Sequence, residues 1–162
     1  MIERLRRLPG WAWDAVLTAG LLVVLALDLV AGTFEGGYPG ASIAAVAVIA
    51  LLPLVRRRHP LGAIYAWALL TSLLAVVLHP EADLLVPFLG LFIFPYNAGL
   101  RVTGRYWMLA PVAIWIALTA SAASAEGAVL GDVFFPGMFA TLFWGVGRAM
   151  ASRGRLTAEL HE

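Results

Sequence analysis

The stretch Arg56-Arg57-Arg58-His59-Pro60 decides the fold of this chain, because it places three consecutive arginines between two apolar runs. All eleven basic residues are arginines, and the other eight also stand in short groups beside apolar runs. Membrane proteins retain Lys and Arg in cytoplasmic loops, close to the ends of their helices. We therefore place every arginine on one side of a membrane. The remaining groups are Arg4, Arg6 and Arg7, then Arg101 and Arg105, and finally Arg148, Arg153 and Arg155.

The composition agrees with a membrane protein. The 162 residues are 62% hydrophobic and only 13% charged, whereas a soluble domain is nearer half apolar and a quarter charged. A globule of this size cannot bury so much apolar surface, so lipid must solvate much of it. The outer side, by contrast, carries only acidic charges, which argues against a nucleic-acid binder. The chain has no cysteine, which excludes disulfides and thiol chemistry.

Six apolar segments predict the fold class: an all-α, polytopic integral membrane protein with six transmembrane helices and both ends in the cytoplasm. We expect it in a bacterial plasma membrane, with the first helix retained rather than cleaved as a signal peptide. The second segment is short, and two prolines in the fourth predict a bend. The segments run about Trp11–Ala31, Gly40–Val55, Leu61–Leu78, Leu84–Leu100, Tyr106–Ala123 and Val133–Gly147.

Polar residues inside the apolar runs are the candidate sites. Asp14 and Asp28 are the only carboxylates there, and an acidic residue within a span is costly to bury. Both lie within about one turn of a helix end, so an interfacial structural role and a sensing or proton-linked role stay open. Asn97, beside Tyr96 and Pro95, is expected to satisfy backbone groups freed by the bend, or to contact a ligand.

Small residues recur at four-residue spacing in Gly137, Thr141 and Gly145, and again in Ala113, Ala117 and Ser121. Faces of this kind let helices approach closely, either within one chain or between two copies.

The sequence contains no constellation typical of an enzyme. There is no phosphate-binding loop with its Lys-Ser/Thr, no zinc-protease helix motif, and no Ser/His/Asp set on one face. The three histidines fall in separate parts of the chain, so no metal site is expected. His59-Pro60 and His79-Pro80 instead predict helix boundaries, because proline disfavours helix in the residue before it. We expect no cofactor in this chain.

Taken together, the spans, loops and exit segment resemble the membrane input region of actinobacterial sensor histidine kinases of the NarL/DesK-type two-component class. The resemblance implies a homodimer whose bundle, residues 1–147, passes a conformational change into a cytoplasmic signalling or linker helix that begins in residues 148–162. It also implies phosphotransfer and ATP-binding domains, which would use ATP and Mg²⁺ and act on a response regulator. The matching residues are Trp11-Ala12-Trp13-Asp14, Arg56-Arg57-Arg58-His59-Pro60-Leu61, Tyr96 with Arg101 and Arg105, and Gly147-Arg148 through Arg155 to Leu160.

The last residues, Glu159-Leu160-His161-Glu162, permit two interpretations. They resemble the family's phospho-acceptor box, in which a histidine precedes an acidic residue, and they also fit the start of a linker helix. Too few residues follow the last span to hold a kinase domain, so this chain by itself is expected to lack kinase activity. Two other functions stay open, namely a small transporter or channel and a non-catalytic membrane subunit of another protein.

Overall fold

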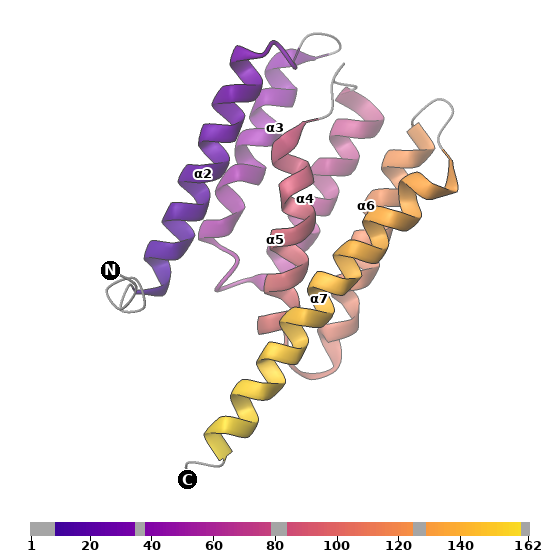
Figure 1. Cartoon of the computed structure of the whole chain (residues 1–162). Helices are drawn as coiled ribbons and strands as arrows, with labels where there is room; N and C mark the ends of the chain where they lie inside the picture. Colours follow the sequence, from indigo (N-terminus) through magenta and orange to yellow (C-terminus); the bar gives the residue numbers. More distant parts are fainter. Residues whose placement is uncertain (1–8, 35–37, 79–83, 125–128, 160–162) are drawn as a thin grey trace.

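The computed structural model describes residues 9–34, 38–78, 84–124 and 129–159, and over these ranges it is all-α, as predicted (Figure 1). Each of the six predicted apolar segments forms an α-helix, and short 3₁₀ or π turns adjoin three of them. The elements are α2 (Gly10–Val30), α3 (Pro39–Leu51), η1 (Leu52–Leu54), α4 (Pro60–Leu73), η2 (Leu74–Leu78), α5 (Leu85–Arg101), η3 (Gly104–Met108), α6 (Leu109–Ser124) and α7 (Leu130–Glu159).

The surface of the bundle is apolar, and several polar side chains are turned inward. Large apolar side chains such as Val23, Leu69 and Leu142 are more than half exposed. A soluble protein would hide most side chains of this kind and keep its carboxylates in water. The distribution is that of a bundle solvated by lipid. The buried polar residues of the described chain are Asp14, Thr18, Asp28, Ser42 and Asn97.

Four stretches of the described chain are long and apolar enough to cross a membrane, which makes the chain a membrane protein by length and composition. They are Gly10–Val30, Pro60–Leu78, Gly104–Ala123 and Leu130–Arg155. The other two apolar helices, Pro39–Leu54 and Leu85–Arg101, are shorter. At 1.5 Å per residue they extend roughly 24–26 Å, against a hydrocarbon thickness of about 30 Å.

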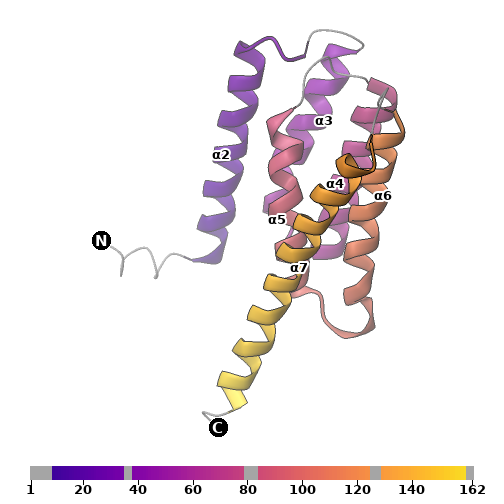
Figure 2. The same ribbon diagram turned by 45° about the vertical axis from the view of Figure 1, so that its right-hand side comes forward.

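Successive helices run in opposite directions, so that alternate connections lie at opposite ends of the bundle (Figures 1 and 2). The turn between α3 and α4, the connection between α5 and α6, and the protruding part of α7 all lie at the end where α2 begins. The arginines of the described chain lie in these connections, at the last residue of α5 and in the second half of α7. We call this end the arginine end. It arises because the arginine groups occur after every second apolar segment.

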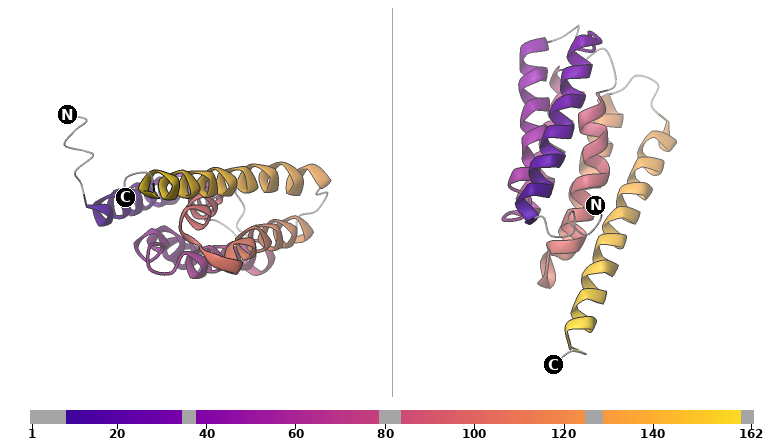
Figure 3. Two further views of the ribbon diagram at one scale, coloured as in Figure 1. Left: turned by 90° about the horizontal axis from the view of Figure 1, so that it is seen from below. Right: turned by 60° about the vertical axis from the view of Figure 1, so that its left-hand side comes forward.

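Helix α5 occupies the centre of the bundle and contacts every other α-helix of the described chain. Its most extensive contact is with α7, which crosses it on one side, while α3 and α4 lie on the other side (Figure 3). The side chains of Val86, Phe94 and Ala98 are almost fully buried in this core. As a result, α5 is largely surrounded by protein rather than by lipid.

Several helix boundaries differ from the predicted ones. Helix α7 runs without a break from Leu130 to Glu159, through Gly147, where the last span was expected to end. Helix α6 begins only at Leu109, because the preceding residues form η3, which starts at Gly104 with a positive φ of 70°. The predicted boundary at His59-Pro60 is confirmed, since α4 starts at Pro60. His79-Pro80 lies outside the described residues.

Candidate functional site

Asp14 is the centre of a polar network at the arginine end. It lies in the second turn of α2 and is only 3% exposed. Its Oδ1 accepts hydrogen bonds from Arg56 Nε at 3.0 Å and Arg56 Nη2 at 2.8 Å. Its Oδ2 accepts from Arg57 Nε. Both carboxylate oxygens are therefore occupied by charged donors, which offsets the cost of burying the charge.

The connection between α3 and α4 holds the two arginines in place. Helix α3 ends at Leu51 and continues into η1, which contains Pro53. Backbone N–H groups of Arg56 and His59 then donate to the carbonyls of Leu52 and Val55, at 3.1 and 3.0 Å. These bonds form a compact turn directly before Pro60. We call residues 52–59 the arginine turn.

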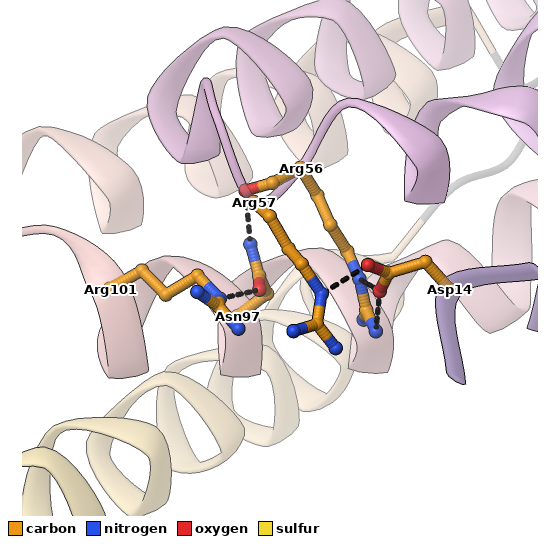
Figure 4. Close-up of polar contacts among 5 residues, drawn as sticks. All are labelled: Asp14, Arg56, Arg57, Asn97 and Arg101. Carbon is orange, nitrogen blue, oxygen red and sulfur yellow. Dashed lines mark hydrogen bonds and ion pairs between the residues drawn. The ribbon is translucent and has the colours of Figure 1, made fainter. Parts of the chain in front are cut away.

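Asn97 joins the arginine turn to α5. Its Nδ2 donates to the backbone carbonyl of Arg56 at 3.1 Å, and its Oδ1 accepts from Arg101 Nε at 3.0 Å (Figure 4). Asn97 and Arg101 are four residues apart and so share one face of the helix. The Asn97 side chain is 3% exposed. The network therefore connects α2, the arginine turn and α5 through groups that are buried or partly buried.

Two glycines bring α5 and α7 into close contact, immediately beside this network. A Cβ at Gly99 would collide with the backbone carbonyl of Trp144, and a Cβ at Gly147 would collide with the backbone carbonyl of Tyr96. The contact is reciprocal, so the two helix backbones approach each other at one crossing. Glycine permits this approach because it has no side chain.

Polar and aromatic contacts flank the glycine crossing. Arg148 Nη1 donates to the Val102 carbonyl at the end of α5, at 3.0 Å. The same guanidinium lies 5.6 Å from the ring centroid of Trp107. Trp107 in turn stacks on Trp144, with centroids 5.2 Å apart and an interplanar angle of 5°. These contacts fix the rotation of α7 relative to the end of α5.

Most of the polar candidates from the sequence meet in this region. Asp14, Arg56, Arg57, Asn97 and Arg101 form the network itself. The others lie around it: Tyr96 Oη lies 3.7 Å from Met150 Sδ, Arg58 is exposed, and Arg105 is exposed with its Nη2 donating to Tyr106 Oη at 2.9 Å.

Asp28 lies at the opposite end of α2 and does not belong to the network. Its side chain is buried at 4% exposure, and its Oδ2 has no hydrogen-bond partner within the described part of the chain. Its backbone carbonyl accepts from Thr33 Oγ1 at 2.9 Å, where the helix ends. The two buried carboxylates of α2 are thus separate sites. His161, Arg4, Arg6 and Arg7 lie outside the described residues.

The predicted small-residue face on α7 is divided between two environments. Gly137 packs against the indole ring of Trp115 on α6, and Thr141 donates to the Gly137 carbonyl at 2.7 Å. Gly145, by contrast, faces open space, where a Cβ would have no neighbour within 4 Å.

Sequence reasoning missed the glycine crossing. Gly147 was assigned only to the exit from the last span, and Gly99 was not singled out, because isolated glycines in helices carry no spacing signal. Trp107 and Trp144 stand near the ends of apolar segments, as is common for amphipathic rings at a membrane interface. Their stacking depends on how α6 and α7 pack, and a single sequence does not encode that visibly.

Comparison of the chain with protein-family models, curated proteins and solved structures found no match.

Proposed function

We propose that the chain is the membrane-embedded sensing and dimerisation domain of a two-component sensor histidine kinase. In this function the bundle passes a conformational change through α7 to cytoplasmic phosphotransfer and ATP-binding domains. The observation that carries the proposal is the continuity of α7. Its 30 residues extend roughly 45 Å, well beyond the hydrocarbon of a membrane. The helix is in close contact with the centre of the bundle and then continues past it (Figure 1).

The proposed topology has six crossings, with the arginine end in the cytoplasm. The uneven distribution of charge supports it, because cytoplasmic loops retain arginine. The two shorter helices fit this topology for different reasons. Helix α5 is enclosed by the other helices, so little of it needs to match the lipid. Helix α3 ends beside Arg56–Arg58, and long basic side chains of this kind reach the headgroups from slightly below them.

The network supports a mechanism in which two packings of the bundle are in equilibrium. A movement of α2 or of the arginine turn alters the hydrogen bonds at Asn97 and so acts on α5. Because α5 and α7 cross through Gly99 and Gly147, α5 cannot rotate or tilt without displacing α7. A stimulus shifts such an equilibrium only by its differential affinity for the two packings. The signal would leave as rotation, tilt or piston movement of α7.

The resemblance to sensor kinases supplies the rest of the proposal. It implies a homodimer in the bacterial plasma membrane, in which residues 1–147 sense and residues 148–162 begin the signalling helix. ATP and Mg²⁺ would be used by the kinase domains, which would pass phosphate to a response regulator. His161 would belong either to the signalling helix or to a phospho-acceptor box.

Spin labelling of the full chain tests the coupling, and the absence of cysteine makes labelling specific. One label would replace Leu69, which is exposed on α4, and the other would replace Arg153 on the protruding part of α7. Asn97→Leu is expected to change the distance distribution between the labels. Thr119→Val, on the exposed surface of α6, is expected to leave it unchanged. If Asn97→Leu gave the same distance distribution as Thr119→Val and the unchanged chain, the proposed coupling between Asn97 and α7 would be overturned.

A further inference from the structure

The polar network carries more positive than negative charge. The guanidinium groups of Arg56 and Arg57 both pair with the carboxylate of Asp14, and a third, that of Arg101, is bonded to Asn97 beside them (Figure 4). Among the described residues, no second carboxylate pairs with them. The surplus is therefore two positive charges in one small region.

Several donors of these arginines have no acceptor among the described residues. Arg57 and Arg101 each use Nε in the network, for Asp14 and Asn97 respectively. Their terminal Nη groups make no hydrogen bond to the part of the chain that the structure describes. Figure 4 shows the two guanidinium groups on either side of Asn97. Four N–H-bearing nitrogens, two from each guanidinium group, therefore have no acceptor among the described residues.

The surroundings strengthen the attraction for an anion. The side chains of Arg56 and Arg57 are only 14% and 33% exposed, so water screens their charges incompletely. The Arg57 guanidinium also lies against Gly10, the first residue of α2. The start of a helix carries free N–H groups and a partial positive charge, which adds to the surplus.

We propose that this region binds one phosphate group, held between the guanidinium groups of Arg57 and Arg101. Planar guanidinium groups bind phosphate oxygens through paired hydrogen bonds, and a phosphate would neutralise the surplus charge. Two sources offer this chemistry: the headgroup of an anionic phospholipid, and a free phosphate anion. The inference deepens the proposed function and rests on it, because it gives the network a ligand whose binding would set the packing of α2 against α5.

Binding would be measured on the full chain in nanodiscs of phosphatidylcholine with increasing fractions of phosphatidylglycerol. A second series would add inorganic phosphate to protein in phosphatidylcholine alone. The readout is the midpoint of thermal unfolding, which a ligand of the folded state raises in a saturable manner. Since this readout does not report movement of α7, failure of binding and failure of coupling are separate results.

The decisive comparison is between Arg101→Gln and Arg105→Gln, which remove the same charge from the same end. We expect Arg101→Gln to weaken the apparent affinity by about tenfold or more, because charged hydrogen bonds are lost. Arg105 is exposed and outside the network, so Arg105→Gln should change the affinity less than about twofold. Saturation by the lipid alone identifies a headgroup site, and saturation by phosphate identifies a site for a soluble anion.

The proposal is overturned if neither probe shows saturable binding, or if the two variants weaken binding equally. Should Arg101→Gln fail to fold, Arg101→Lys retains the charge and removes the planar fork. It is then expected to bind about threefold more weakly than the unchanged chain. Binding by Arg101→Lys as tight as that of the unchanged chain would also contradict the proposed geometry.

Discussion

Gly99 of α5 and Gly147 of α7 each lie against the backbone of the other's helix, with no room for a side chain at either position. This crossing is the structural connection between the centre of the bundle and the helix that leaves it. It lies two residues after Asn97 and one residue before Arg148, so polar contacts hold both of its sides. A change in the network therefore reaches α7 over a very short path.

The glycine crossing predicts that Gly99→Ala lowers stability. The added Cβ would meet the Trp144 carbonyl, and since both groups are part of rigid helices, the helices must separate. We expect a loss of about 1–3 kcal/mol, the range of overpacking substitutions. Thermal unfolding in detergent micelles measures it. Gly145→Ala is the matched control, because its Cβ meets nothing, and its higher helix propensity should raise stability by up to about 1 kcal/mol. Equal effects of the two substitutions would contradict the crossing.

The ion pairs of Asp14 predict that Asp14→Asn destabilises the fold. The substitution leaves Arg56 and Arg57 without a counter-charge in a region that water reaches only partly. Because both arginines retain some exposure, we expect a loss of about 1–3 kcal/mol, below that of a fully buried pair. Asp132→Asn provides the control. Asp132 is exposed near the start of α7, where its Oδ2 accepts the Val129 N–H at 2.9 Å. The prediction fails if both variants unfold at the same temperature.

Asn97→Leu is expected to loosen the arginine turn while leaving the helices intact. Leucine has a similar size, but it leaves the Arg56 carbonyl and Arg101 Nε without their partner. Hydrogen exchange of amides in residues 52–59 should then become faster, since a lost buried hydrogen bond costs about 1–3 kcal/mol. Thr119→Val removes only a local bond to the Trp115 carbonyl on the surface of α6. Unchanged exchange of the turn in Asn97→Leu would show that Asn97 does not hold it.

The sequence predicted the helical class well, because lipid leaves a chain few ways to satisfy its backbone. It also suggested Asp14 and Asn97 as sites, since polar groups in apolar runs are costly. The sequence did not indicate which residues Asp14 and Asn97 contact. Asp14 and Arg56 are 42 positions apart, and only the packing of α2 against the arginine turn brings them together. A helix after the last span was also predicted, as the start of a linker helix, and in the structure it continues from that span without a break at Gly147.

Labelling of residues at the two ends of the bundle is the most direct test of the six-crossing topology on which this account depends. Single cysteines would replace Tyr38 and Leu85 at one end, and His59 and Thr103 at the arginine end, without removing any arginine. In intact cells, a membrane-impermeant maleimide should label only the first two positions, and it should label the second two only after permeabilisation. Labelling of Tyr38→Cys and His59→Cys from the same side would show that α3 does not cross, and would contradict the account.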